Sequence, residues 1–365
     1  MIRISPRTTV KIVLLLLFIS RASVTGAQLK YPAPAEGDYT ISNFIFASGE
    51  TLPSLRLHYT TIGSPRADAQ GHTVNAVIIM HGTSGSGRNF LSDAFAGNLF
   101  GKGQLLDAEK YFIILPDGIG HGRSSKPSDG LHMRFPHYNY DDMVKADYLL
   151  LTEHLKVDHA RLVMGTSMGG MHTWVWAYTY PGFMDALLPL ASLPVEIAGR
   201  NRIQRKMAID LIRMDPEWKG GEYAKQPTVG LTGAISSMIF MTSSPLQWQK
   251  SAPTRVQSEA MLDNIRNRYL NTLDANDFIY QFDASRDYNP APHLEKITAP
   301  LFAVNSADDQ VNPPELGLME KEIARVKKGR YILLPITDKT AGHGTHSLPA
   351  VWGAYLEELL RISAK

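Results

Sequence analysis

A serine flanked by small residues stands where a predicted strand passes into a predicted helix. The segment Gly165-Thr166-Ser167-Met168-Gly169 has the pattern G-x-S-x-G, which by itself is a weak signal. An apolar run ends directly before the segment and a helical pattern begins directly after it. A sharp turn between strand and helix exposes a serine hydroxyl above the edge of a sheet, where it can attack a carbonyl carbon. We therefore predict Ser167 as a nucleophile; the alternative is a glycine-rich turn with an incidental serine.

A second glycine-rich segment, His81-Gly82-Thr83 followed by residues 84–87, comes after an earlier apolar run. Attack on a carbonyl requires two backbone N–H donors that face the oxygen as it becomes negative. The loop after an early strand supplies one donor, and the residue after the nucleophile supplies the other. We assign these roles to Thr83 and Met168. The alternative, a phosphate-binding loop, is disfavoured because no Gly-Lys-Ser/Thr sequence closes the segment.

Two adjacent carboxylates follow a late apolar run at residues 301–304. Sheets that carry such a serine place an acid next along the chain and a histidine last. We favour Asp309 as this acid, because it stands four residues before Pro313, as is typical of similar loops. Asp308 remains the alternative at this stage.

A histidine between two glycines, His343, follows the last predicted strand at residues 331–334. As a general base it would take the Ser167 proton, while the acid fixes its tautomer. His346 is the second choice, and a structural role is the alternative for any single histidine. The spacing of the two histidines lacks the helical H-E-x-x-H arrangement, and adjacent carboxylates in an extended loop point apart. We predict neither a metal site nor a cofactor.

Short apolar strands that alternate with helices are expected to position these residues. The predicted strands are 40–46, 55–61, 74–80, 112–115, 162–164, 186–190, 301–304 and 331–334, and the predicted helices are 142–155, 168–178, 315–326 and 348–362. Continuous apolar strands are buried on both faces, as in a parallel sheet, whereas the first two strands suit an antiparallel edge. The pattern predicts an α/β fold with a mostly parallel, doubly wound sheet.

No strong strand pattern is present between residues 194 and 292. We predict a helical cap insertion there, between a first core segment at 28–193 and a second at 293–365. The Pro-rich stretch 31–37 is expected to be a linker. For a basic cluster in the cap we favour a solvated helix face, with binding of a substrate carboxylate as the alternative; its members are Arg200, Arg202, Arg205 and Lys206.

The N-terminus has the order of a secretory signal peptide, predicted to span residues 1–27. Basic residues precede an eight-residue apolar run at 12–19, and Thr25-Gly26-Ala27 offers a cleavage site. The run is too short to span a bilayer, which needs about 20 residues. We expect a periplasmic or secreted protein without stable membrane insertion; an uncleaved anchor is the alternative, because Arg21 follows the run.

The charge balance and the lack of cysteine exclude several classes of function. Without the four basic residues of the first 27 positions, the chain has 33 basic and 35 acidic residues, a net charge of −2. This balance does not indicate the strongly basic surface by which proteins bind nucleic acid. The 365 residues contain no cysteine, which excludes disulfides, a cysteine nucleophile and a thiolate zinc site.

A set of further motifs occurs together in one known family. They are GTSMGGM at 165–171, FP at 135–136 followed by DMV at 142–144, DPEWKGGEY at 215–223, DAN at 274–276, and the acid and base loops at 309–314 and 342–343. With them the chain resembles the homoserine O-acetyltransferase-like group of α/β-hydrolases from about residue 74 onward. The resemblance implies an α/β-hydrolase fold with a helical cap, a triad of Ser167, Asp309 and His343, and suggests a homodimer.

The chain also departs from the pattern of these transferases. Asp141 stands where they usually have Arg, and Asp277 where they have Ser. Gln204-Arg205 lies about one helical turn upstream of the position of their Gln-Arg pair. We therefore do not assign a substrate-binding arginine on the basis of the resemblance. The glycines of segment 117–125 suit a tight turn near the rim of the active site, with a plain connecting loop as an equal alternative. The segment looks more like the corresponding loop of ordinary hydrolases than like that of the transferases.

These departures and the predicted secretion decide between functions that share an acyl-enzyme. Acetyl-CoA is a cytosolic metabolite, so a secreted transferase would lack its donor. We predict a serine hydrolase that acts on a small-molecule carboxylic ester. The alternative is a homoserine-type O-acyltransferase using acetyl-CoA, and a non-catalytic ligand-binding protein on the same fold is less favoured.

Overall fold

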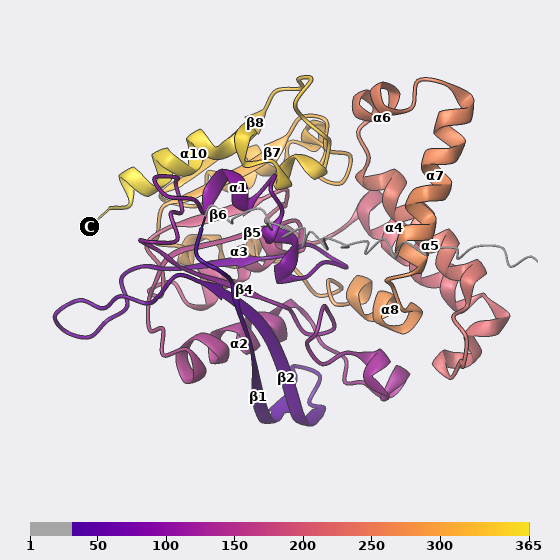
Figure 1. Cartoon of the computed structure of the whole chain (residues 1–365), viewed down its shortest axis with the longest axis horizontal. Helices are drawn as coiled ribbons and strands as arrows, with labels where there is room; N and C mark the ends of the chain where they lie inside the picture. The colour runs from indigo at the N-terminus through magenta and orange to yellow at the C-terminus, as the bar shows by residue number, and fades with distance from the viewer. Residues whose placement is uncertain (1–30, 365) are drawn as a thin grey trace, which may run out of the picture.

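A computed structural model describes residues 31–364, and the predicted signal peptide lies outside this range. Its centre is an eight-stranded sheet with the order β1-β2-β4-β3-β5-β6-β7-β8 (Figure 1). The strands are β1 (Ala35–Ile45), β2 (Thr51–Ile62), β3 (Ala76–Met80), β4 (Phe112–Pro116), β5 (Ala160–Thr166), β6 (Leu187–Leu190), β7 (Leu301–Ser306) and β8 (Gly329–Leu334). Only the β1–β2 and β2–β4 pairs are antiparallel. The predicted mostly parallel sheet with an antiparallel edge is confirmed.

Helices cover both faces of the sheet because its central strands are apolar on both sides. The helices of this core are α1 (Ala96–Leu99), α2 (Tyr140–Leu149), α3 (Met168–Thr179), α9 (Leu318–Ile323) and α10 (Pro349–Ile362). One apolar cluster joins the sheet to α2, α3 and α9, with Trp174 and Met319 buried in it. A second cluster on the opposite face includes Leu99 of α1 and Trp352 of α10. The sheet is therefore doubly wound, as predicted.

Several predicted elements differ in extent, among them the first two strands, which begin at Ala35 and Thr51. The helix predicted at 315–326 is only six residues long as α9, because Pro314–Leu316 forms a 3₁₀ turn that ends at Gly317, with φ of 61°. The helix predicted at 142–155 ends as an α-helix at Leu149 and continues as a π-helical turn, Leu150–His154. The expected linker 31–37 is shorter, since β1 already begins at Ala35.

Five helices lie between β6 and β7 and form the cap. They are α4 (Gly199–Arg213), α5 (Thr228–Thr242), α6 (Pro245–Ser251), α7 (Arg255–Leu270) and α8 (Ala275–Asp283). Residues of α4, α5 and α8, such as Ile212, Leu231 and Phe278, form an apolar cluster separate from the two beside the sheet. Figure 1 shows these helices gathered at one end of the molecule, with α8 nearest the core.

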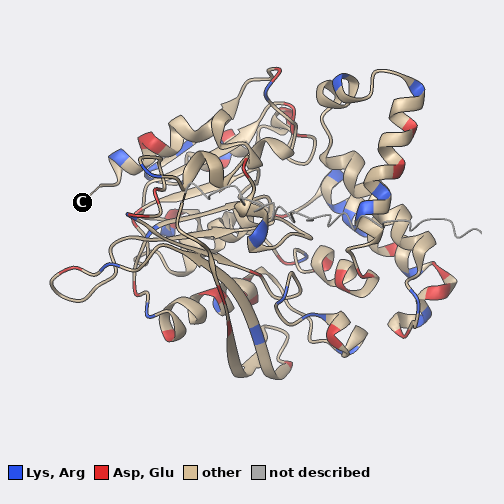
Figure 2. Ribbon diagram, viewed as in Figure 1, with Lys and Arg blue, Asp and Glu red and all other residues tan. Residues whose placement is uncertain are grey.

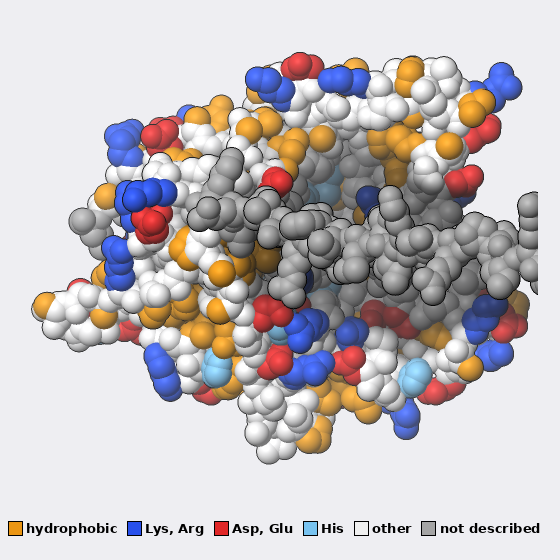
Figure 3. Space-filling model, in the orientation of Figure 1, with side chains coloured by type: hydrophobic (Ala, Val, Ile, Leu, Met, Phe, Trp, Pro, Cys, Tyr) orange, Lys and Arg blue, Asp and Glu red, His pale blue; other side chains and the backbone are white. Residues whose placement is uncertain are grey.

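The surface carries both signs of charge in alternation. Figure 2 shows Lys and Arg interspersed with Asp and Glu over core and cap, with several basic residues on α4. On the face drawn in Figure 3 the molecule is hollowed between cap and core. Within residues 31–364 no single helix is long and apolar enough to cross a membrane, and only the bent pair α5–α6 meets that test when taken together.

Candidate active site

Ser167 occupies the turn between β5 and α3. Its backbone has φ of 56° and ψ of −112°, a conformation that non-glycine residues rarely adopt. The turn is close enough to β3 that its neighbours must be glycines. A Cβ at Gly165 would lie 2.2 Å from the Gly169 carbonyl oxygen, and one at Gly169 would lie 1.9 Å from the Met80 carbonyl oxygen. The strained turn therefore depends on both glycines, and it places Ser167 above the edge of the sheet.

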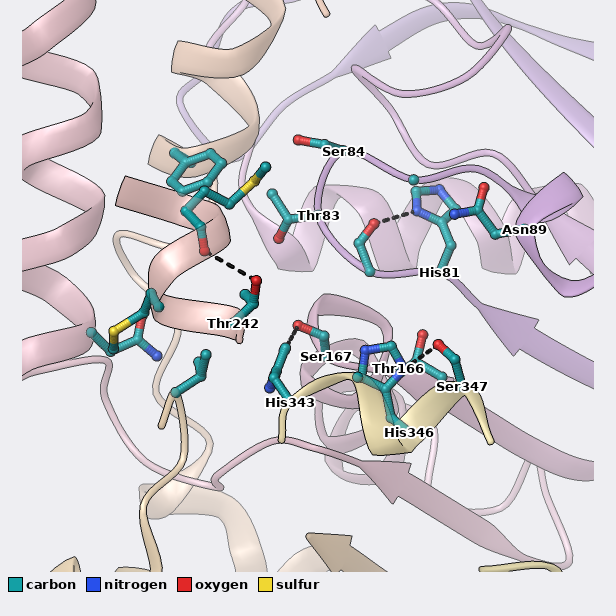
Figure 4. A pocket seen from close by; sticks show the side chains of 18 of the residues that line it. His81, Thr83, Ser84, Asn89, Thr166, Ser167, Thr242, His343, His346 and Ser347 are labelled. Carbon is teal, nitrogen blue, oxygen red and sulfur yellow. Dashed lines mark hydrogen bonds between the residues drawn. The ribbon is translucent and has the colours of Figure 1, made fainter. Parts of the chain in front are cut away.

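Ser167, His343 and Asp309 form one hydrogen-bonded chain. His343 Nε2 lies 2.7 Å from Ser167 Oγ, and His343 Nδ1 lies 2.9 Å from Asp309 Oδ2. The three side chains come from the end of β5 and from the loops after β7 and β8, whose carboxyl ends meet at one edge of the sheet. Figure 4 shows Ser167 and His343 facing each other beside the pocket. The structure thus brings together the three residues that the sequence singled out.

The Asp309 carboxylate is held in its ionised form. Burial would raise its pKa, but the charge and hydrogen bond of His343, together with further donors, lower the pKa below its ordinary value. These donors are Asn312 Nδ2, 3.0 Å from Oδ2, and the Val311 N–H, 2.8 Å from Oδ1. An ionised carboxylate accepts a hydrogen bond from His343 Nδ1–H, which leaves Nε2 unprotonated and able to accept a hydrogen bond from the Ser167 hydroxyl.

Asp308 and His346 have other contacts. Asp308 accepts hydrogen bonds from the Gly342 N–H at 2.9 Å and from Ser306 Oγ at 2.5 Å, so it holds the loop that carries His343. His346 lies edge-on to His343, with ring centroids 5.2 Å apart, and its Nδ1 pairs with Ser347 Oγ. Burial lowers the pKa of His346 to about 3, so this ring is neutral. The sequence alone left both alternatives open, and the geometry favours Asp309 and His343.

The two residues assigned to the oxyanion hole come from two segments that lie next to Ser167 in the structure. Met168 is the first residue of α3, so its N–H belongs to the free N-terminal turn of that helix. Thr83 follows Gly82, whose Cα is so near the turn that a Cβ there would lie 3.4 Å from Ser167 Cβ. Figure 4 shows Thr83 and Ser84 across the pocket from Ser167 and His343. Both placements suit the predicted donors.

The segment 117–125 anchors the loop that carries Thr83. The Gly118 N–H donates to His81 Nε2 at 3.0 Å, and the Gly87 N–H donates to Asp117 Oδ1 at 2.7 Å. Burial lowers the pKa of His81, so its ring is neutral and Nε2 can accept this bond. Of the two functions considered for this segment, a place beside the active site is the one its contacts support.

A cavity of about 340 Å³ extends from Ser167 to the cap. Thr83, Ser167 and His343 line it from the core, whereas Asn201, Arg205 and Met241 line it from α4 and α5. Among the described residues that line it, Arg205 is the only Lys, Arg, Asp or Glu. The cavity therefore has a single permanent charge, which is positive.

Arg205 is buried without a carboxylate partner. Its side chain is 5% exposed, Nε donates to Asn201 Oδ1 at 3.0 Å, and Nη1 has no hydrogen-bond partner within the described chain. The guanidinium lies 5.6 Å from the centroid of the Phe282 ring. Burying a cation without a counter-ion is costly, so the arrangement suits an anionic group bound in the cavity.

The expectation of a solvated helix face was wrong for Arg205. The spacing of Arg205 relative to Ala208, Ile209 and Ile212 is three, four and seven residues, which puts it on the buried stripe of α4. Lys206, by contrast, has a side chain 68% exposed and pairs with Asp210. Helical periodicity within α4 could therefore have separated Arg205 from the other members of the basic cluster.

Comparison with known proteins agrees with this geometry. Residues 75–344 match the family described as alpha/beta hydrolase fold. The chain belongs to this family. Homoserine O-acetyltransferase of Pelobacter propionicus is 29% identical over 348 residues, which cover 84% of this chain and 91% of that protein. The "Probable acyltransferase" of Methanothermobacter thermautotrophicus is 30% identical over 76% of this chain and 84% of that protein. Within the α/β-hydrolases the chain is thus of the homoserine O-acetyltransferase-like group.

The fold of this α/β-hydrolase is shared by a transferase and a hydrolase. The crystal structure of homoserine O-acetyltransferase from Bacillus anthracis has a TM-score of 0.78 at 20% identity, with 90% of this chain and 97% of that chain covered. An acetylester hydrolase from Corynebacterium glutamicum has a TM-score of 0.78 at 21% identity, with coverage of 90% and 96%. Since the same architecture serves both reactions, the acceptor of the acyl group must be inferred from the site itself.

Two of the departures from the transferase pattern, Asp141 and Asp277, lie away from the lining of the cavity, whereas Gln204 and Arg205 belong to that lining. Asp141 accepts a hydrogen bond from Tyr178 at 3.0 Å, and Asp277 accepts from the backbone N–H and hydroxyl of Ser128 at 2.8 and 2.6 Å. Neither of these carboxylates is among the described residues that line the cavity. The changes at these two positions therefore give no contact with the cavity that would separate a transferase from a hydrolase.

Proposed function

We propose that the protein is a serine O-acyltransferase of the homoserine O-acetyltransferase type, which transfers an acyl group to the hydroxyl of a small alcohol that bears a carboxylate. The observation that carries the proposal is the buried, unpaired Arg205 in the cavity that holds Ser167. Relatives named homoserine O-acetyltransferase, which match over both core and cap, support it.

In the first half of the reaction Ser167 Oγ attacks the carbonyl carbon of the acyl donor. His343 Nε2 takes the hydroxyl proton, and Asp309 stabilises the resulting imidazolium through Nδ1–H. The N–H groups of Thr83 and Met168 bind the oxyanion of the tetrahedral intermediate. The bond to the leaving group then breaks, His343 returns its proton to that group, and the acyl group remains on Ser167.

In the second half a hydroxyl replaces the leaving group. The acceptor hydroxyl gives its proton to His343 Nε2 and attacks the acyl carbon, and the same two N–H groups bind the second oxyanion. Collapse of this intermediate breaks the bond to Ser167 Oγ, which regains the proton from His343. Arg205 would bind the negative charge of the acceptor and so hold its hydroxyl near the acyl carbon, which favours it over water.

Hydrolysis of a carboxylic ester is the second candidate, and the hydrolase-like segment 117–125 favours it. In that reaction water replaces the acceptor alcohol while the roles of Ser167, His343 and Asp309 stay the same. The predicted signal peptide also favours hydrolysis, because an exported enzyme would be separated from cytosolic acetyl-CoA.

Two assays on the purified protein distinguish these functions. Release of CoA from acetyl-CoA that requires homoserine supports transfer, whereas release of p-nitrophenol from p-nitrophenyl acetate without any use of acetyl-CoA supports hydrolysis. In either case Ser167→Ala should reduce the rate by about a millionfold, since it removes the nucleophile. A Ser167→Ala protein with the wild-type rate would exclude this serine as nucleophile.

A further inference from the structure

The apex of the loop that carries Thr83 is held by the cap. The two ends of this loop, residues 81–87, are bonded to the segment after β4 through His81 and Asp117. The residue next to Thr83, Ser84, has φ of 60°, a conformation that costs energy for a residue with a side chain. Its hydroxyl donates to Oε1 of Gln281 at 2.8 Å. Gln281 belongs to α8, so this bond joins the cap to the loop of the oxyanion hole.

Both ends of the Gln281 amide are used, which fixes its orientation. Nε2 donates to the Gly120 carbonyl oxygen at 2.8 Å, and the side chain is only 5% exposed. Since a carbonyl oxygen can only accept, the NH₂ group must face Gly120 and the amide oxygen must face Ser84. Ser84 is therefore the donor of its bond. One glutamine thus ties α8 to the loops after β3 and β4 at once.

We propose that Gln281 is a positioning residue for the oxyanion hole and makes the hole depend on the seating of the cap. The inference rests on the proposed function, in which the Thr83 N–H binds the oxyanion. When α8 sits on the core, Gln281 holds Ser84 in its strained conformation and so directs the adjacent Thr83 N–H. When that contact is broken, Ser84 relaxes and the donor loses its preset direction. Gln281 itself touches no reacting atom.

The test compares variants at the two ends of the hydrogen bond between Ser84 and Gln281. Ser84→Ala removes the donor, Gln281→Met removes the acceptor at similar side-chain length, and the double variant removes both. Gln226→Met is the matched control, because Gln226 accepts from the Ala275 N–H at 3.0 Å at the other end of α8. It weakens the contact of α8 with the rest of the cap without touching the oxyanion loop.

Two measurements report on the hole itself. The first is kcat and KM for p-nitrophenyl acetate per active site, with sites counted by reaction to completion with diethyl p-nitrophenyl phosphate. The second is the affinity for butaneboronic acid, which forms a tetrahedral adduct with a serine and can be measured without turnover. Counting sites removes the contribution of unfolded protein, so a residue with a merely structural role would change neither quantity.

Each single variant should lower kcat per site by about tenfold to a hundredfold, somewhat less than the loss of a whole donor, and leave KM within about threefold. Boronate affinity should fall in proportion. Because both variants break the same bond, the double variant should resemble the worse single variant. Gln226→Met should keep the wild-type kcat per site.

The inference is overturned if Ser84→Ala keeps kcat and boronate affinity within about threefold of wild type. It is equally overturned if the two single effects multiply in the double variant, or if Gln226→Met loses as much as Gln281→Met. Ser84 lies on a partly exposed loop, so Ser84→Ala decides the outcome even if Gln281→Met does not fold. Wild-type protein that neither turns over the ester nor binds the boronate would overturn the proposed function as well.

Discussion

At the scale of single residues, two adjacent carboxylates have different tasks. Asp309 faces His343, whereas Asp308 holds the Gly342 N–H. Asp309→Asn should lower kcat by about a thousandfold to ten-thousandfold, because a neutral amide can hold the wrong tautomer of His343. Asp308→Asn should lower kcat by less than about tenfold, since its amide oxygen can still accept from Gly342. Steady-state kinetics of the two variants measure the difference, and a larger loss in Asp308→Asn would reverse the assignment.

Arg205 should affect affinity for the acceptor and stability in opposite directions. Arg205→Met should lower kcat/KM for a carboxylate-bearing acceptor by about tenfold to a hundredfold, because a charge-assisted hydrogen bond is lost. Its free energy of unfolding should be unchanged or higher, since an unpaired buried cation is replaced by an apolar chain of similar length. Homoserine and butanol serve as paired acceptors, with urea unfolding as the stability measurement.

Lys206→Met is the matched control for Arg205, because it removes an exposed charge from the next position of α4. This variant should keep the wild-type preference for homoserine over butanol. A preference that survives in Arg205→Met would contradict the assignment of the cavity's charge to substrate binding.

At the scale of elements, the turn between β5 and α3 is limited by backbone contacts. Gly165→Ala would place its Cβ 2.2 Å from the Gly169 carbonyl oxygen. This oxygen belongs to the backbone, so it cannot move aside as a flexible side chain could. We expect the free energy of unfolding to fall by about 3 kcal/mol, as in an overpacked core. Gly182→Ala, with no atom within 4 Å of the new Cβ, should stay within about 0.5 kcal/mol of wild type. Urea unfolding measures both, and an equal effect would contradict the argument.

The same elements explain which parts of the site the sequence could predict. Ser167, Asp309 and His343 each follow an apolar strand, and the ends of parallel strands meet at one edge of a sheet whatever the loops between them. Gln281 was not predicted as a functional residue, because its contacts join the cap to the core over long sequence distances. For Arg205 the binding of a substrate carboxylate was only the alternative prediction, although the periodicity of α4 indicates that this side chain is buried. The local sequence pattern indicates that α4 and α8 are helices, but it does not indicate how these helices pack against the core.

At the scale of the whole molecule, α8 is one of the connections between the cap and the loops of the active site. Asp277 bonds to Ser128, Gln281 bonds to Ser84 and Gly120, and the Tyr280 hydroxyl donates to the Met133 carbonyl oxygen at 3.1 Å. The catalytic chain belongs to the core, whereas the charge in the cavity belongs to the cap. The proposed reaction therefore needs the cap and the core in fixed relative positions, and α8 is one of the elements that hold them there.

The burial of Asp277 where α8 contacts the core should make the stability of the folded protein depend on pH. Burial, opposed by the hydrogen bonds from Ser128, raises the pKa of Asp277 from 3.8 to about 7, and nearby Asp274 adds to the rise. The folded protein thus binds this proton more tightly than the unfolded chain. Between pH 4 and pH 7 the unfolded state loses the proton first, so the free energy of unfolding falls as pH rises through this interval.

Asp277→Asn should remove this fall, because its amide does not titrate. Relative to the variant, wild-type protein should lose a few kcal/mol, at most about 4, between pH 4 and pH 7. Asp129→Asn is the control, since its carboxyl is 41% exposed on the 3₁₀ helix Pro127–Asp129 that Asp277 contacts. Urea unfolding at pH 4, 5.5 and 7 measures the three proteins. A difference between wild type and Asp277→Asn that does not change with pH would show that Asp277 is already ionised in the folded protein.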